Sequence, residues 1–338
     1  MSAPASTRLR AVNFDVNFKY GEELGRMGPA GVDLILQPTR GEDNIIRACA
    51  GADIILIENA DQAFNARIIG TLDRCRAIFR YGVGVDNIDV AAATRAGIVV
   101  GNAADFCTEE VSDHAVALML AHTRRILAMD RAVRQGIWAN FARAGMRRIS
   151  HLTLGLVGYG RIARATARKM SGFKMRMLAA DPFVQEAEPG SGVELVSIEK
   201  LFAESDIISV HAPLMAETRG LVSERLLRLM KPTAILVNTS RGPVVDEAAL
   251  ARALEGKWLG GAALDVTVEE PLADSSPLRK FENVIITPHH GAFSEDSMEH
   301  LQRTVTDSVV AVAGGFWPPF PVNPKVTPRV PLKPYPVR

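Results

Sequence analysis

"LTLGLVGYGRIA", residues 152–163, is the stretch that decides the fold this sequence predicts. Its apolar start leads into the pattern G-x-G-x-x-A, formed by Gly158, Gly160 and Ala163. In a dinucleotide-binding strand–turn–helix unit, the first glycine allows a tight turn and the second lets the backbone approach a pyrophosphate. The small third residue lets the helix pack on the strand. We therefore predict a Rossmann-type βα unit here.

Residues beside this fingerprint also fit the binding of a dinucleotide cofactor. Tyr159, Arg161 and Ile162 complete the turn, and N–H groups at the start of the helix would hold the pyrophosphate. Asp181 follows the next apolar run, about twenty residues further on. A carboxylate there binds the ribose hydroxyls and repels a 2′-phosphate, which favours NAD over NADP. The alternative is a glycine turn followed by a surface aspartate, with no cofactor.

Short apolar runs alternate with helix-like segments along the chain, which indicates an α/β fold with parallel sheets. Before the fingerprint, strand candidates begin at Leu9, Val32, Asp53, Cys75 and Gly97. From the fingerprint on, they are "LTLGLVG", "MRMLAADP", "DIISVHAP", "AILVNTSRG", "GAALDV" and "NVIITPHH".

The stretch between the two series, "CTEEVSDHAVALMLAHTRRILAMDRAV", predicts one long helix with Thr108 as its N-cap. Its apolar positions place His122 near the packed face, so we expect a structural role for that histidine. The Pro-rich tail from Phe316 predicts an extended surface segment.

Length and composition exclude several classes of protein. At 338 residues the chain is long for one core, so we expect two domains. A net charge of +1 gives no electrostatic case for binding nucleic acid or acidic membranes. Cys49, Cys75 and Cys107 form neither a CxxC motif nor a metal-binding spacing, so we expect no metal site. With no signal peptide or membrane-spanning run, a cytoplasmic protein is predicted.

Three polar residues stand where strands of the second series end. Arg241 follows "ILVNTS", Glu270 follows "LDVTVE", and His289 follows "IITP". An arginine can hold a carboxylate with its planar fork, and a histidine beside a carboxylate can donate a proton to a carbonyl oxygen. This set suits hydride transfer to a 2-oxo acid. The alternative is that all three are surface or structural residues.

At these residues the sequence resembles the D-isomer-specific 2-hydroxyacid dehydrogenases. The resemblance runs from "RYGVGVDNIDV" (from Arg80) to the last helix, through "GLVGYGRIA", "HAPLMAETRGLV", "LMKPTAILVNTSRGPVVDEAAL", "GAALDVTVEEPL" and "VIITPHH". Within the family, "DFCTEEVSDHAVALML" and "FSEDS" look most like the C-terminal-binding-protein-like bacterial subgroup.

The resemblance implies roles for individual residues. Arg241, Glu270 and His289 match the catalytic arginine, glutamate and proton donor. His290 is a departure from the family, which commonly has a small or apolar residue there; it tunes the site or fills space. Further contacts are implied as follows: Ala212, Pro213 and Thr218 near the adenosine and phosphates; Thr239 and Arg241 near the nicotinamide; Asp265 at its carboxamide; His289 and Gly291 beside its ring; and Val83 and Gly84 at the substrate carboxylate.

The resemblance also implies the domain layout. Residues 1–103 and 295–338 are expected to form a flavodoxin-like substrate-binding domain, and residues 104–294 an NAD-binding Rossmann domain, with a cleft between them. A homodimer formed through the nucleotide-binding domain is implied as well. Ala292 and Phe293 stand where the subgroup tends to have aromatic residues, so the substrate can differ from that of relatives.

The function this predicts is an NAD-dependent D-2-hydroxyacid dehydrogenase or 2-oxo acid reductase. One alternative is an NAD(H)-sensing protein with vestigial catalysis, although a sensor has no need of a proton donor. Another alternative keeps the enzyme but changes the donor to a different small anion such as phosphite. The sequence leaves the identity of the 2-hydroxy acid open.

Overall fold

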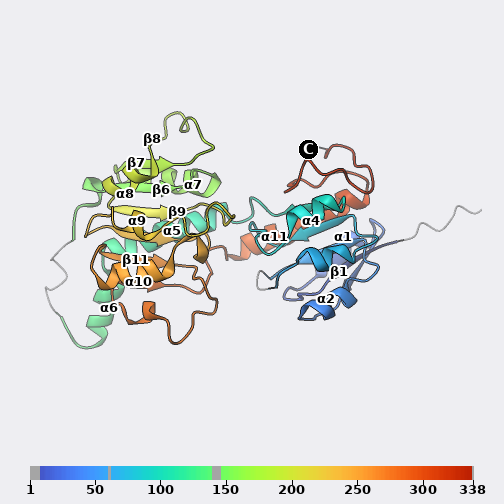
Figure 1. Ribbon diagram of the computed structural model, residues 1–338, viewed down its shortest axis with the longest axis horizontal. Coiled ribbons are helices and arrows are strands. Elements are labelled where there is room, and N and C mark those ends of the chain that lie inside the picture. Colours follow the sequence, from blue (N-terminus) through green and yellow to red (C-terminus); the bar gives the residue numbers. More distant parts are fainter. Residues whose placement is uncertain (1–7, 60–61, 139–145, 337–338) are drawn as a thin grey trace, which may run out of the picture. The chain divides into compact units, whose positions relative to one another are not determined.

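The structure is a computed structural model that describes residues 8–59, 62–138 and 146–336 (Figure 1). The chain divides into two compact units. Unit 1 comprises Met1–Phe106 and Ser294–Arg338, and unit 2 comprises Cys107–Phe293. The boundaries expected after residues 103 and 294 lie within about three residues of this division.

Unit 1 is built on a five-stranded parallel sheet in the order β2-β1-β3-β4-β5, the order of flavodoxin-like folds. The strands are β1 (Leu9–Asn13), β2 (Val32–Leu36), β3 (Ile54–Ile57), β4 (Ala77–Arg80) and β5 (Val99–Asn102). The helices are α1 (Gly21–Met27), α2 (Glu42–Ala48), α3 (Ala66–Gly70), α4 (Val90–Arg95) and α11 (Glu295–Ala313). β3 and β4 are buried along their whole length, which parallel strands covered on both faces require.

Helix α11 completes unit 1 from the far end of the chain. It packs against α1 and β4, and it begins with a capping box between Ser294 and Ser297. Gln302 Nε2 donates to Glu23 Oε1 at 2.8 Å, and Arg26 forms an ion pair with Asp307. These contacts tie the C-terminal segment to the first helix of the same unit.

Unit 2 contains a seven-stranded parallel sheet in the order β12-β11-β10-β9-β6-β7-β8 (Figure 1). Its strands are β6 (Thr153–Val157), β7 (Arg176–Ala180), β8 (Val193–Leu195), β9 (Ile207–Val210), β10 (Ile235–Asn238), β11 (Gly261–Leu264) and β12 (Val284–Ile286). The strand order reverses between β6 and β9. In open α/β sheets, ligands bind beyond the carboxyl ends of the strands at such a switch point.

Helices cover both faces of this sheet. They are α5 (Thr108–Thr123), α6 (Ile126–Arg134), α7 (Arg161–Ser171), α8 (Ile198–Glu204), α9 (Glu224–Leu227) and α10 (Glu247–Glu255). Short 3₁₀ helices are η2 (Ile149–His151), η3 (Gly242–Val244) and η4 (Pro277–Lys280). The α/β class, the parallel sheets and the Rossmann unit at the fingerprint are confirmed.

Some local predictions were wrong. The expected single long helix is two helices, because Arg125 adopts a left-handed conformation (φ +53°) between α5 and α6. The N-cap of α5 is Cys107 and not Thr108. The Pro-rich tail is partly buried: Asn323 is 7% exposed, and its side chain bonds the backbone of β5 and the residue before it.

One further finding concerns membranes. Across residues 8–59, 62–138 and 146–336, no helix combines the length and apolar character needed to cross a bilayer.

Candidate active site

The glycine turn of the fingerprint leaves room at the start of α7. Gly158 has φ +86°, and a Cβ there would lie 3.0–3.2 Å from the backbone of His211 and Ala212, so only glycine fits. At Gly160, by contrast, a Cβ would meet no atom within 4 Å. The space beside the backbone at the start of α7 is therefore open at Gly160, which suits the close approach of a pyrophosphate. Ala163 is fully buried where α7 packs on the sheet.

Asp181 is held by backbone groups at the ends of two neighbouring strands. Its Oδ2 accepts from Tyr159 N–H at 2.8 Å, and its Oδ1 accepts from Phe183 N–H at 2.8 Å. Each carboxylate oxygen can accept further hydrogen bonds, so a ribose diol can still be bound. The contact with Tyr159 fixes the carboxylate beside the glycine turn.

Two threonines predicted to lie near the cofactor differ in their surroundings. Thr218 Oγ1 donates to Pro213 O at 2.6 Å and accepts from Met215 N–H at 2.8 Å, so it shapes the loop after β9. Thr239, at the end of β10, is 8% exposed, and its hydroxyl has no hydrogen-bond partner among the described residues. A buried hydroxyl of this kind needs a partner, and a bound cofactor would supply one.

Arg241 is presented by a turn that the buried Asn238 organises. Asn238 Oδ1 accepts from Ser240 N–H at 3.0 Å, and its Nδ2 donates to Arg241 O at 3.0 Å. The next residue, Gly242, lies against the loop after β11: a Cβ there would fall 1.9 Å from Thr267 O. The missing side chain therefore lets the loops after β10 and β11 come together.

His289 and Glu270 form a direct pair. His289 Nδ1 lies 2.7 Å from Glu270 Oε2, and Glu270 Oε1 accepts from Thr267 N–H at 3.1 Å. Burial raises the pKa of the Glu270 carboxyl, but the His289 hydrogen bond and the nearby charge of Arg241 contribute to a net lowering. The carboxylate is therefore ionised at neutral pH. Because it engages Nδ1, the other ring nitrogen of His289 is left to exchange a proton.

Asp265 organises the segment that carries His289. Its backbone oxygen accepts from His289 N–H at 2.8 Å, and its carboxylate accepts from His290 N–H at 3.0 Å and Gly291 N–H at 2.9 Å. Burial alone raises the pKa of the Asp265 carboxyl, but hydrogen bonds that include those of His114 and Thr287 hold it well below its ordinary value. Asp265 is thus a buried anion at the centre of a hydrogen-bonded cluster.

His211 and His290 differ from His289 in their contacts. Burial lowers the pKa of the His211 imidazole to about 4, so this side chain is neutral. His290 Nδ1 lies 2.6 Å from Pro288 O, and its ring stacks on Phe293 with centroids 4.8 Å apart. Both contacts stay within its own loop, which supports a packing role for His290.

Val83 and Gly84 belong to unit 1, in the loop after β4. Val83 is 37% exposed, and its carbonyl accepts from Asn102 Nδ2 at 2.6 Å. The buried Arg80 braces the start of this loop by donating to Glu58 O at 2.5 Å and to Tyr81 O. Arg80 therefore braces the start of this loop, and Asn102 holds the carbonyl of Val83.

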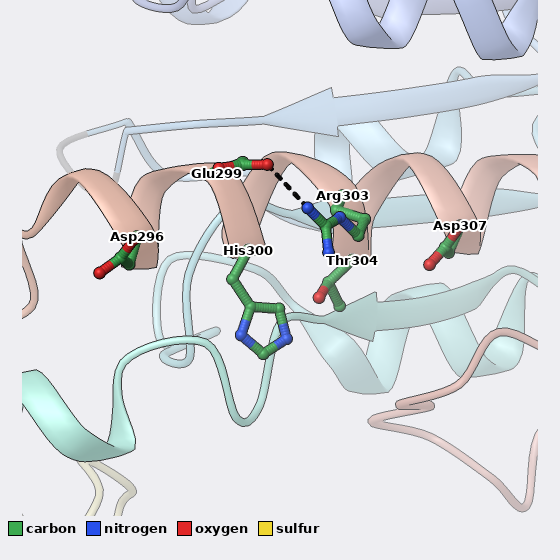
Figure 2. A pocket seen from close by; sticks show the side chains of 6 residues that line it. All are labelled: Asp296, Glu299, His300, Arg303, Thr304 and Asp307. Carbon is green, nitrogen blue, oxygen red and sulfur yellow. Dashed lines mark hydrogen bonds and ion pairs between the residues drawn. The ribbon is translucent and has the colours of Figure 1, made fainter.

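A hollow along α11 in unit 1 is a different feature. Figure 2 shows its lining residues, which share one face of the helix: Asp296, Glu299, His300, Arg303, Thr304 and Asp307. Arg303 Nη2 donates to Glu299 Oε1 at 2.7 Å, and the His300 ring turns away from that pair. None of the predicted site residues lies there, so the candidate active site remains at the strand ends of unit 2.

Sequence reasoning missed three contributors to the site: Asn238, Gly242 and His114. Asn238 and Gly242 lie on either side of the turn at Arg241. A glycine directly after the predicted catalytic arginine could have indicated from the sequence that another backbone segment passes close by. His114 Nε2 lies 3.0 Å from Thr287 Oγ1, although the two residues are 173 positions apart. No local pattern marks a contact of that kind.

Comparison with known proteins agrees with this geometry. Residues 116–291 match the family described as "D-isomer specific 2-hydroxyacid dehydrogenase, NAD binding domain". A glyoxylate reductase of Korarchaeum cryptofilum is 42% identical over 276 residues, covering 80% of this chain and 83% of that protein. A D-3-phosphoglycerate dehydrogenase of Synechocystis is 39% identical over 90% of this chain and 56% of its own.

Solved structures agree as well. The crystal structure of a glyoxylate reductase from Paecilomyes thermophila superposes with a TM-score of 0.87 at 26% identity, covering 95% of this chain and 99% of that one. The chain belongs to the D-isomer-specific 2-hydroxyacid dehydrogenase family. It binds NAD and is an oxidoreductase acting on the CH–OH group of 2-hydroxy acids. The narrower resemblance to the C-terminal-binding-protein-like subgroup stays a prediction.

Proposed function

We propose that this protein reduces a small 2-oxo acid to the D-2-hydroxy acid with NADH, using His289, Glu270 and Arg241. The observation that carries the proposal is the 2.7 Å contact between His289 Nδ1 and Glu270 Oε2. This contact orients the ring and stabilises the imidazolium, so that the second ring nitrogen can protonate the carbonyl oxygen. When bound, the cofactor supplies the hydride.

The other residues bind and orient the substrate in this proposal. The guanidinium of Arg241 holds the substrate carboxylate and polarises its carbonyl. The backbone of Val83 and Gly84 in unit 1 is a separate proposed contact for a substrate carboxylate. Glyoxylate is a substrate to test first, because the name of the Korarchaeum relative states that activity.

We also propose which residues bind the cofactor. The N–H groups around Gly160, Arg161 and Ile162 hold the pyrophosphate, and Asp181 binds the adenosine ribose and excludes a 2′-phosphate. Further contacts come from Tyr159, Ala212, Pro213, Thr218, Thr239, Asp265 and Gly291. The unpartnered hydroxyl of Thr239 and the open space at Gly160 support this assignment.

The test is NADH oxidation against glyoxylate, hydroxypyruvate, pyruvate, phenylpyruvate and 2-oxoglutarate, with NADPH run beside it. We expect turnover with NADH on one class of substrate. Arg241→Ala should abolish turnover while NADH still binds; near-normal activity in that variant would contradict its role. Tight NADH binding without turnover on any 2-oxo acid would favour an NAD(H)-sensing protein or a different small anion as substrate.

A homodimer through unit 2 is part of the proposal. Helix α6 exposes Ile126, Leu127 and Val133 by 45–49%, and Trp138 shortly after the helix is 90% exposed. Apolar side chains gathered on one short helix in this way indicate a protein contact surface.

A further inference from the structure

We propose that His114 is a positioning residue for the reaction: through Thr287 and Asp265, it holds the segment that carries His289. The proposal rests on the role of His289 as proton donor and adds to it a residue on another element. His114 lies in α5, with a side chain that is 25% exposed. It does not touch the His289–Glu270 pair in any contact the structure gives.

The hydrogen-bond directions in this cluster follow from the geometry. Thr287 Oγ1 lies 2.6 Å from Asp265 Oδ1, and only the hydroxyl of this pair carries a proton, so Thr287 donates. The Thr287 oxygen is then an acceptor for His114 Nε2, 3.0 Å away. The same His114 nitrogen lies 3.3 Å from Asp265 Oδ1. His114 is therefore a donor from Nε2, and it serves both partners.

Asp265 transmits this contact to the catalytic segment. Its backbone oxygen and its two carboxylate oxygens accept the N–H groups of three consecutive residues, His289, His290 and Gly291, at 2.8–3.0 Å. With Asp265 only 3% exposed, the protein must supply these donors, because little water can reach the carboxylate. A shift of Asp265 would therefore move the backbone on both sides of the His289 side chain.

Gly291 shows that the segment also packs on the imidazole itself. A Cβ at Gly291 would lie 2.9 Å from Asp265 Oδ2 and 3.2 Å from His114 Cδ2. The backbone thus passes directly over His114, and any side chain there would push the two apart. The ring of His114 therefore both donates a hydrogen bond and lies against the backbone at Gly291.

A second histidine on the same helix provides a matched control. His122 Nε2 lies 3.0 Å from Asn283 O, just before β12, whereas Thr287 comes just after β12. Both histidines thus connect α5 to an end of the same strand. Only His114 is tied to the segment of His289, so only its loss should disturb catalysis.

The experiment compares His114→Phe, which keeps a ring but removes the donor, with His114→Gln, which can restore an N–H near the position of Nε2. His122→Phe is the control. We expect His114→Phe to lower kcat by about tenfold or more, because small displacements of catalytic groups are costly. KM for the 2-oxo acid should change less than kcat. The Kd of NADH should rise as well, because Asp265 and Gly291 are proposed cofactor contacts, and His114→Gln should recover most of both kcat and the affinity for NADH. An unchanged kcat in His114→Phe, or an equal loss in His122→Phe, would overturn the proposal.

A second measurement does not depend on activity. Amide hydrogen exchange of residues 284–293 should be faster in His114→Phe and in Thr287→Val than in the wild type, and unchanged at 289–291 in His122→Phe. Unchanged exchange in all variants overturns the role of His114 even if the enzyme is active. If the wild type reduces no 2-oxo acid, the proposed function fails, and the exchange result still decides whether His114 holds the segment. Should His114→Phe not fold, Thr287→Val and His114→Gln carry the same comparison.

Discussion

His289 occupies a backbone conformation that few residues other than glycine adopt. Its φ is +55°, in the left-handed region, which costs an L-residue about 1–2 kcal/mol. Two hydrogen bonds from its N–H, to Asp265 O at 2.8 Å and Thr287 O at 3.1 Å, offset that cost. The strained turn directs the side chain to Glu270, so the geometry of one residue links the end of β12 to the loop after β11.

The pairing of His289 with Glu270 predicts how a charge change alters catalysis. Glu270→Gln removes the carboxylate that orients the His289 ring at 2.7 Å. Because proton transfer by a side chain depends on its being held in place, kcat/KM for 2-oxo acid reduction should fall by about tenfold or more. The measurement is kcat/KM of both variants and the wild type at pH 7. Glu269→Gln, at the exposed neighbour, should keep the wild-type value; an unchanged kcat/KM in Glu270→Gln would mean that the pair does not support proton transfer.

Asp265 should make stability depend on pH in a defined direction. Its pKa in the folded protein lies well below the ordinary value of 3.8, so its stabilising effect is fully present above that value. The effect is lost as pH falls toward the folded-state pKa, because the unfolded chain takes up the proton first. Asp265→Asn should lower the free energy of unfolding by roughly 2 kcal/mol or more at pH 7. Urea unfolding at pH 7, 5 and 3.5 should show the difference from wild type shrinking at the lowest pH; a constant difference would contradict this.

At the scale of elements, the site depends on how closely two loops approach. Gly242 follows Arg241, and a Cβ there would fall 1.9 Å from Thr267 O and 2.5 Å from Val268 N. Gly242→Ala should therefore separate the loops after β10 and β11, destabilise the fold by about 1–3 kcal/mol and lower kcat as well. Thermal unfolding and steady-state kinetics test both effects. Gly172→Ala is the control, since a Cβ there meets nothing within 4 Å; equal behaviour of the two variants would rule out the close approach as the cause.

The sequence predicts the longer helices and strands of this fold better than the breaks and short elements between them. Apolar runs bounded by turn residues predict strands such as β6 and β10, because buried parallel strands need that composition. The break at Arg125 carries no glycine or proline, so periodicity runs through it unnoticed. β8, with only the three residues Val193–Leu195, is too short to show a pattern.

Some residues of the candidate site could likewise be predicted from the sequence, and others could not. Arg241, Glu270 and His289 could be proposed from their places after strands, since carboxyl ends of parallel strands meet at one edge of a sheet. The support beneath them could not be predicted. His114 meets Thr287 across 173 residues, and Gly242 matters only because another loop lies against it. Contacts of this kind depend on tertiary packing, which local composition does not encode.

At the scale of the whole molecule, the proposed association through α6 would leave the proposed cofactor site within one chain. The glycine turn, Asp181, Thr239 and Asp265 all belong to unit 2 of the same chain. A variant that separates the subunits should therefore keep its affinity for NADH. Loss of both properties together would instead indicate that the substitutions unfold unit 2.

The oligomeric state can be tested by placing charges on α6. Ile126→Glu combined with Val133→Glu puts two carboxylates on positions that are 49% exposed in the single chain. Burying unpaired charges in an interface is costly, so the double variant should sediment as one 36.6 kDa chain at concentrations where the wild type sediments as two. Leu24→Glu, at a 52% exposed position on α1 of unit 1, should remain dimeric. A wild type that sediments as a single chain would contradict the homodimer itself, whereas a dimeric double variant would move the interface away from α6.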